Sequence, residues 1–480
     1  MKKCIGLILF GLLIVAFSAP VYAVDWKASG YLDTNYFYYK NIFKGNQIYG
    51  NHKGTDGNAM GDDRHWNKTG QYFNTRGRLK IDAGIGKDVT GTMFFEMDSA
   101  RWGEVVGGKD QVGKWTADQA AVEVKNLYLD FGIPYVGIPV PMTARIGIQP
   151  LSVRSEMLIT TDGPGITLGF KADPVTISPF WFKASQSKDY AANDADVFGT
   201  QLIAKVDKLT LGAYGVFYDM RTYPLTSVTY TNVDPSFKAR MFWFGGYADG
   251  KVGPMDMKAD FVMDKGSVKD FGATGHDEVK YQGWVARLKL SFPVEMFEVG
   301  AQGLYGTGSD AKKTAGSGLP GSTTPYGNKS FKVGSYVVPP GTEEHVAFGA
   351  SGSGYFLGGN GITSRGPDNT ASSGTSLSRG AIGGVWFAQA FASYKVAPWY
   401  KVTAIGSYIG DTTKNGNTVG TARKASGDPR DDKAIGWELG LFNEIQIYKN
   451  LSWGTVFAYM IAKDGLDVWS ATEGRNLSPQ

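Results

Sequence analysis

The sequence predicts an all-β fold: a transmembrane antiparallel β-barrel of about 16–18 strands, with short periplasmic turns and long extracellular loops. The first observation behind this prediction is an alternation of apolar and polar side chains that recurs about seventeen times, with almost no helical pattern between the repeats. From Met255 to Asp264, apolar residues fill the odd positions, and Asp or Lys fills most even positions. Because successive side chains of a strand point to opposite sides, this segment has one apolar face and one charged face. So many two-faced strands indicate a barrel in lipid rather than a soluble sandwich.

The alternation predicts seventeen strands, with boundaries accurate to a few residues. They span residues 26–40, 70–86, 88–101, 119–132, 141–150, 163–172, 174–186, 195–207, 208–220, 237–249, 254–265, 278–292, 294–307, 381–396, 399–411, 433–448 and 450–463.

The second observation is that the connections between these strands alternate in length. Short connections lie at residues 84–89, 172–175, 206–209, 252–255, 292–296, 397–400 and 448–451. Between them are long connections, notably 41–68 and 308–380. Outer-membrane barrels have short periplasmic turns and long outer loops, whereas a soluble sandwich has no reason to sort its loops by length.

An odd number of strands conflicts with the even number found in single-chain bacterial barrels. Two explanations stay open. A further strand can lie within residues 330–338 of the long loop, or the chain can lack its closing strand, in which case residues 464–480 form one more extracellular loop. The second explanation is favoured, because the chain does not end in the aromatic residue that closes most such barrels.

The N-terminus has the pattern of a secretory signal peptide at residues 1–23. Lys2 and Lys3 precede an apolar run from Ile5 to Phe17, and small residues follow up to Ala23. Removing both lysines lowers the formal net charge of +4 by two, so charge does not indicate a nucleic-acid partner. No later segment has the roughly 20 apolar residues of a membrane helix, so the predicted membrane entry is by strands.

Cysteine and histidine usage limits the chemistry that the chain can perform. The one cysteine, Cys4, lies within the predicted signal peptide, so disulfides, thiolate metal sites and a cysteine nucleophile are excluded from the mature chain. The four histidines, His52, His65, His276 and His345, all fall in predicted loops. No catalytic residue, metal or cofactor is therefore predicted, although a carboxylate pair such as Glu96 with Asp98 is not excluded as glycosidase-like.

Aromatic residues gather near several predicted strand ends, as at Tyr36–Tyr39 and at Trp399 with Tyr400. Trp and Tyr favour the boundary between lipid and water, which predicts an aromatic girdle and contact with outer-membrane lipid and lipopolysaccharide. The alternative is the ordinary β-propensity of aromatic residues.

The polar face of the strands is predicted to line an aqueous lumen, because a charge facing hydrocarbon costs about 2–4 kcal/mol near the midplane. A change of register after Lys125 predicts a bulge in its strand. Rows of opposite charge would select polar solutes; alternatively, the charges pair locally and only keep the lumen hydrated. The predicted pore-lining residues are Arg76, Arg78, Lys80, Glu96, Asp98, Glu123, Lys125, Arg145, Arg240, Asp256, Lys258, Asp260, Arg287 and Lys289.

The longest loop, 308–380, is rich in Gly, Ser and Thr. Loops of this length are usually functional or disordered. This one can fold into the barrel as a constriction or plug, or stay outside as a cap or trimer contact; partial inward folding is favoured.

Three short stretches are similar to Gram-negative outer-membrane porins, with some similarity to eighteen-stranded barrels of the alginate-export type. They are Gly30-Tyr31-Leu32, the basic row Arg76, Arg78 and Lys80, and the stretch from Arg145 to Pro150. The resemblance implies an outer-membrane channel for passive diffusion of small hydrophilic or anionic solutes. By analogy with many porins, it also implies a homotrimer. The alternatives are a channel exporting a polyanionic polysaccharide and a barrel that sheathes a partner protein.

Overall fold

The computed structural model describes residues 24–40, 69–98, 102–103, 122–134, 137, 139–186, 194–220, 238–269, 278–310, 330–340, 382–416, 422–428, 430–470 and 474–478. The predicted signal peptide, all four histidines and most of the loop 308–380 lie outside the described residues. The chain divides into two compact units, which are described separately. Unit 1 comprises residues 1–36 and 73–149, and unit 2 comprises residues 37–72 and 150–480.

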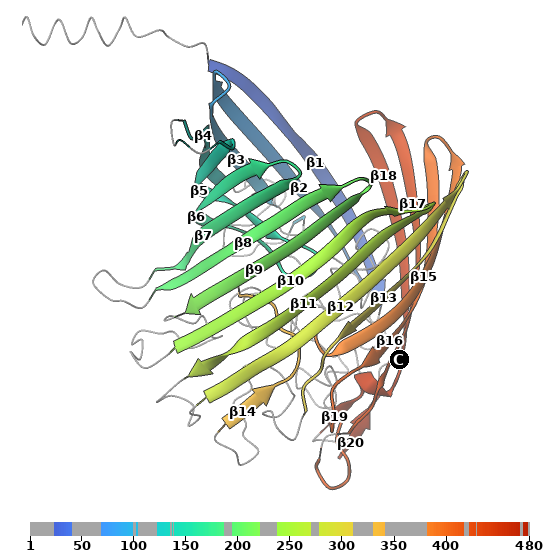
Figure 1. The fold of residues 1–480 in the computed structure, drawn as a ribbon. Coiled ribbons are helices and arrows are strands. Elements are labelled where there is room, and N and C mark those ends of the chain that lie inside the picture. The colour runs from blue at the N-terminus through green and yellow to red at the C-terminus, as the bar shows by residue number, and fades with distance from the viewer. Residues whose placement is uncertain are drawn as a thin grey trace, which may run out of the picture. The chain divides into compact units, whose positions relative to one another are not determined.

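The fold is all-β, with eighteen strands grouped in one sheet and two more in a small separate sheet (Figure 1). The elements are β1 (Val24–Lys40), β2 (Thr69–Ile85), β3 (Val89–Asp98), β4 (Glu123–Gly132), β5 (Met142–Val153), β6 (Ile159–Ala172), β7 (Val175–Ser185), β8 (Ala195–Val206), β9 (Leu209–Met220), β10 (Lys238–Val252), β11 (Met255–Lys269), β12 (Glu278–Val294), β13 (Phe297–Gly306), β14 (Ser330–Val333), β15 (Val385–Ala397), β16 (Tyr400–Asp411), β17 (Ala434–Tyr448), β18 (Leu451–Ala462), η3 (Asp464–Leu466), β19 (Val468–Ser470) and β20 (Arg475–Leu477).

Every one of the seventeen predicted strands is present, and the all-β prediction is confirmed. A further strand, β14, lies where one was suspected within the long loop. It has four residues and pairs with β12 in parallel, whereas the long strands with described registers pair antiparallel. Four residues span about 13 Å, too short for a crossing that needs about 9–11 residues. Among the described residues, the number of strands long enough to cross is therefore seventeen.

The sheet of unit 2 has two unlike faces, which are called here the polar face and the apolar face. On β11, Asp264 is fully buried, whereas Phe261, on the opposite face, is 47% exposed. Exposed large side chains of the apolar face include Phe242, Phe244, Phe261, Trp284, Leu288, Phe292, Val299, Tyr305, Trp437, Leu439 and Leu441. Buried polar side chains of the polar face include Asp260, Asp264, Arg287, Ser291, Gln302, Gln389, Ser393, Thr403, Ser407, Asp411 and Glu438. A protein that buries polar groups and exposes its large apolar ones has the pattern expected in lipid.

Aromatic residues form two rows on the apolar face of unit 2. Neighbouring rings are in contact in both rows, with centroids 5.2 Å apart for Trp284 and Tyr305 and 4.5 Å apart for Phe297 and Tyr394. The rows lie eight residues apart along the strand in four cases: Trp284 and Phe292, Tyr305 and Phe297, Trp386 and Tyr394, and Tyr408 and Tyr400. Eight residues of strand span about 26 Å, which on a tilted strand approaches the roughly 25 Å apolar band of outer-membrane barrels. Trp399 and Tyr400, predicted to lie in a girdle, belong to the row at the short turns.

Unit 1 has the same two-faced construction on β2 to β5. Leu79, Leu127, Leu129 and Ile148 are exposed on one face, while Asn126 and Thr92 are buried on the other. The pairing of β3 with β4 shifts register between Phe94 and Phe95, which leaves Lys125 as an extra residue on β4. The predicted bulge is therefore confirmed.

Candidate functional site

An inward hairpin of unit 2, residues 150–164, forms the first part of the candidate site. It carries the end of β5 and the start of β6, and β6 pairs with β7 only from Gly165 onward. Its tip is a tight turn in which the backbone N–H groups of Met157 and Leu158 donate to the carbonyl of Arg154, at 2.7 and 2.9 Å. Val153, Met157 and Leu158 are fully buried, so the tip packs against other parts of the unit. The sequence predicted only a plain connection here.

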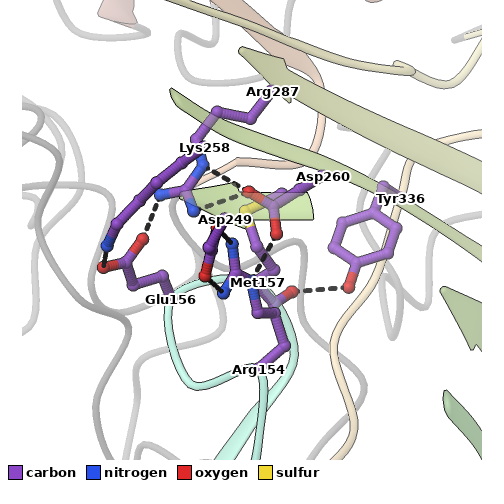
Figure 2. Close-up of polar contacts among 8 residues, drawn as sticks. All are labelled: Arg154, Glu156, Met157, Asp249, Lys258, Asp260, Arg287 and Tyr336. Atoms are coloured by element: carbon purple, nitrogen blue, oxygen red, sulfur yellow. Dashed lines mark hydrogen bonds and ion pairs between the residues drawn. The ribbon is translucent and has the colours of Figure 1, made fainter. Parts of the chain in front are cut away.

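Arg154 joins this tip to the strands β10 and β11 (Figure 2). Its guanidinium donates two hydrogen bonds to the carboxylate of Asp249, at 2.5 and 2.7 Å, and a further one to Asp260. The guanidinium also lies over the ring of Tyr247, 4.2 Å from its centroid. Burial alone would lower the pKa of Arg154, but Asp249 and Asp260 hold that pKa above its usual range. The side chain is therefore a permanent cation with two anionic partners.

Glu156 makes the second set of contacts between the tip and the wall (Figure 2). It pairs with Arg287 of β12 and with Lys258 of β11, the latter at 3.3 Å. Arg287 in turn donates from its Nε to Oδ2 of Asp260, at 2.8 Å. Burial would raise the pKa of Glu156, but Arg287 and Lys258 outweigh it and hold this pKa below its usual value. The tip is thus fixed to three strands by alternating charges.

A strap from the long loop, residues 333–340, lies against the same polar face. The backbone N–H of Val337 and that of Gly283 both donate to the buried carboxylate of Asp264, each at 3.1 Å. Trp243 donates its indole N–H to the carbonyl of Val337 at 2.8 Å. A Cβ on Gly283 would lie 2.4 Å from the backbone nitrogen of Tyr336, so this close approach requires glycine. The described part of the long loop therefore folds onto the polar face, as favoured from the sequence.

The hairpin and the strap are joined directly to each other. The hydroxyl of Tyr336, a fully buried residue, donates to the carbonyl of Met157 at 2.7 Å (Figure 2). Two segments 179 positions apart in the chain thus cover one region of the polar face. The hairpin and the strap therefore form one connected layer over this part of the polar face.

Lys289 is a cation of this region that, unlike Arg287 and Lys258, has no carboxylate partner among the described residues. It lies directly opposite Lys258 in the pairing of β11 with β12, and its ammonium is 5.0 Å from the ring centroid of Phe391. Within the described part of the chain it makes no hydrogen bond or ion pair. The predicted residue Asp256 is not part of the cluster around Arg154; it pairs with Lys251, at 3.2 Å. Of the predicted residues in unit 2, Lys258, Asp260 and Arg287 meet in one cluster and Lys289 flanks it.

The predicted residues of unit 1 pair with neighbours on the same or on adjacent strands. Arg78 pairs with Glu96, its opposite residue in the β2–β3 register, and Lys125 lies 3.8 Å from the same carboxylate. Lys80 pairs at 3.0 Å with Asp82.

Three further pairs of positions involve predicted residues of unit 1. Arg145 donates two hydrogen bonds to Asp130, at 2.7 and 2.9 Å. Arg76 is opposite Asp98 in register, and Glu123 is opposite Glu96. Local pairing, the alternative left open by the sequence, accounts for most of these charges.

Arg240 is on the other face from the one predicted. It alternates along β10 with Ala239 and Met241, which are fully buried, and so shares the apolar face with Phe242. Its Nε is 3.4 Å from a carboxylate oxygen of Asp219, near the strand ends. The prediction was wrong because β10 is apolar on both faces here: its buried side chains pack under the strap instead of facing water.

The sequence did not single out the residues through which the hairpin and the strap meet the strands. In the hairpin and strap they are Arg154, Glu156 and Tyr336, and on β10 and β11 they are Trp243, Asp249 and Asp264. Two charges within the short segment 151–159 were the available signal, since they interrupt the apolar run Leu151, Val153, Met157, Leu158 and Ile159. The described residues contain no group of three His, Asp or Glu side chains placed to hold a metal ion. No described helix is long and apolar enough to span a membrane.

Comparisons with known proteins give distant structural likenesses. No family model matches the chain, and no curated protein sequence matches it. Among solved structures, the chain is similar to Pseudomonas aeruginosa OccK8 (OprE), with 11% identity, 91% of this chain and 94% of that chain covered, and a TM-score of 0.48. It is similar to P. aeruginosa OccK3 (OpdO), with 12% identity, 91% of each chain covered and a TM-score of 0.46.

A third similar structure is a BenF-like porin from Pseudomonas fluorescens Pf-5, with 11% identity, 92% and 94% covered and a TM-score of 0.44. Since these TM-scores lie below 0.5, the function is inferred below from the strands and side chains of the chain itself. The resemblance to alginate-export barrels stays a prediction.

Proposed function

We propose that the chain is an outer-membrane porin that passes small hydrophilic or anionic solutes by passive diffusion, with no chemical step. The observation that carries the proposal is the inverted sheet of unit 2, which exposes apolar side chains on one face and buries charged ones on the other. Closing such strands into a barrel puts the apolar face against lipid and the polar face around water. The two aromatic rows then lie at the two membrane boundaries, where contact with lipid and lipopolysaccharide is expected.

The hairpin and strap are the proposed constriction of this channel. Both lie on the polar face, and both are fixed there by buried polar contacts, Arg154 with Asp260 and Val337 with Asp264. Lys289 and Lys258 add positive charge beside them, which favours anionic over cationic solutes.

Neither alternative function has a specific observation in its favour. A polyanion exporter would need a continuous row of available cations, whereas Arg78, Arg145, Arg154 and Arg287 are each paired with a carboxylate. The homotrimer is proposed from the porin resemblance alone.

Single-channel recording tests the proposed function. Protein purified from outer membranes in detergent and added to a planar bilayer should give discrete, long-lived conductance steps. A salt gradient should give a reversal potential displaced toward the anion. Protein that is folded, as shown by β-rich circular dichroism and heat-modifiable gel mobility, but that gives no steps would contradict the proposal.

A further inference from the structure

Gln302 and Lys289 place two hydrogen-bond donors side by side on the polar face. They are directly opposite each other in the antiparallel pairing of β12 with β13. Opposite residues of such a pair have Cβ atoms about 4.5–5.5 Å apart on one face. Their terminal nitrogens can therefore reach a single acceptor placed between them.

The amide of Gln302 lacks an acceptor in the described structure. The residue is 6% exposed, and its Nε2 is buried without a hydrogen-bond partner among the described residues. Gln389, the next residue in the same row, shows the ordinary situation: its Nε2 donates to Ser407 at 3.0 Å. Because buried donors almost always have a partner, the unsatisfied donor of Gln302 points to an acceptor that the protein itself does not provide.

Lys289 brings a positive charge that makes no ion pair among the described residues, and the carboxylates of Glu298 and Glu156 act on it only from a longer distance. The cation opposite it, Lys258, is bound to Glu156, and the next one on its own strand, Arg287, is bound to Asp260 and Glu156. Two like charges directly opposite on one face destabilise a sheet. An anion bound at Lys289 would relieve this repulsion.

Phe391 gives the same place an apolar wall. Its ring lies under the ammonium of Lys289, with 5.0 Å between the nitrogen and the ring centroid. The ring packs flat over Gly300, where a Cβ would lie only 2.3 Å from it. The place thus combines a cation, a neutral donor and an aromatic surface.

We propose that Lys289 and Gln302 form one saturable subsite for the anionic oxygen group of a small solute, with Phe391 beside the solute's apolar part. The subsite rests on the proposed porin function, and it adds a discrete binding step to diffusion. It is separate from the paired charges at Arg154, whose partners are all within the protein.

The test is the conductance of single channels as a function of potassium acetate concentration. The wild-type conductance should saturate. Gln302→Leu should raise the acetate concentration at half-saturation about fivefold, because one hydrogen bond is lost. Lys289→Gln should raise it about tenfold or more and move the reversal potential toward the cation, because a charge-assisted contact is lost. Gln389→Leu is the matched control, since that amide is already satisfied by Ser407, and its half-saturation should equal that of wild type.

The outcomes separate this subsite from the proposed function. Channels whose conductance rises linearly with acetate, or a Gln302→Leu variant that behaves like Gln389→Leu, would leave the porin intact and overturn the subsite. The second result would mean that a fixed water satisfies Gln302. Folded protein without any channel would overturn the porin function itself. Gel mobility of each variant before and after heating shows that the barrel has folded.

Discussion

The ion pairs of unit 1 and those around the hairpin tip of unit 2 differ in how far apart their partners lie in the chain. In unit 1, Arg145 and Asp130 are fifteen residues apart and face each other across adjacent strands. In unit 2, Arg154 is 106 residues from Asp260, and Glu156 is 131 residues from Arg287. The first kind of pair follows from the strand register, and the second depends on a hairpin leaving the sheet.

The two sets of pairs also differ in burial, and therefore in energy. The side chains of Arg145 and Asp130 are 35% and 38% exposed, whereas those of Arg154 and Asp260 are 12% and 0% exposed. Exposed pairs are worth about 0–1 kcal/mol, but removing one partner of a buried pair costs about 3–5 kcal/mol. Arg78 and Glu96 of unit 1 are also largely buried, at 20% and 12% exposed, so the contrast concerns the pair of Arg145 with Asp130. That pair contributes little stability, while Arg154 and its partners hold the hairpin tip against the strands.

The largest expected effect is that of Arg154→Ala. It leaves Asp249 and Asp260 without their shared cation, which should cost about 3–5 kcal/mol locally and release the hairpin tip. Single-channel conductance should rise, and the melting temperature in detergent should fall. Arg145→Ala is the matched control, with an expected cost near 1 kcal/mol or less and no change in conductance. Equal effects of the two variants would contradict the contrast between the units.

A second substitution, Asp264→Asn, acts on the strap. The carboxylate accepts two backbone N–H groups, from Gly283 and Val337, and an amide can accept only one of them while its own NH₂ faces the other. We expect a cost of about 1–3 kcal/mol and larger fluctuations of the open-channel current. Asp256→Asn, at a half-exposed carboxylate paired with Lys251, should leave both the current and the stability unchanged. If the open-channel current of Asp264→Asn fluctuated no more than that of wild type, the strap would be held by other contacts.

The joint between hairpin and strap gives a smaller effect. Tyr336→Phe removes the hydrogen bond to the carbonyl of Met157 and should cost about 1 kcal/mol, measured as a fall in melting temperature. Tyr214→Phe is the matched control, because the buried hydroxyl of Tyr214 has no partner among the described residues, and its loss should be neutral or stabilising. The prediction fails if both variants destabilise equally.

The parts of the molecule that the sequence could predict are those that depend on local periodicity. Apolar and polar side chains alternate along β11 and β17 because one face of each strand is buried and the other is not. This local alternation made the strand positions predictable, and its interruption at Lys125 made the bulge predictable. The contacts of the proposed constriction could not be predicted. They join the β5–β6 hairpin, the strands β10–β12 and the strap, which are far apart in the sequence, and no local sequence pattern shows that these segments touch. Arg240 shows the same limit: its face depends on the strap that packs against the other side of β10.

The smallest expected effect is a pH dependence of the channel conductance that arises from the titration of Glu156. Its pKa is held below the usual value by Arg287 and Lys258, so the stability that this carboxylate contributes is present above the ordinary glutamate pKa of about 4.3 and is lost as pH falls through the lowered one. As the pH falls from 7 through this lowered pKa, the conductance should therefore shift toward that of Arg154→Ala. Glu156→Gln cannot titrate and should remove this part of the pH response, while Arg145→Ala keeps it. A response that persists in Glu156→Gln would assign it to other carboxylates, and Glu156 would then not contribute to holding the hairpin tip.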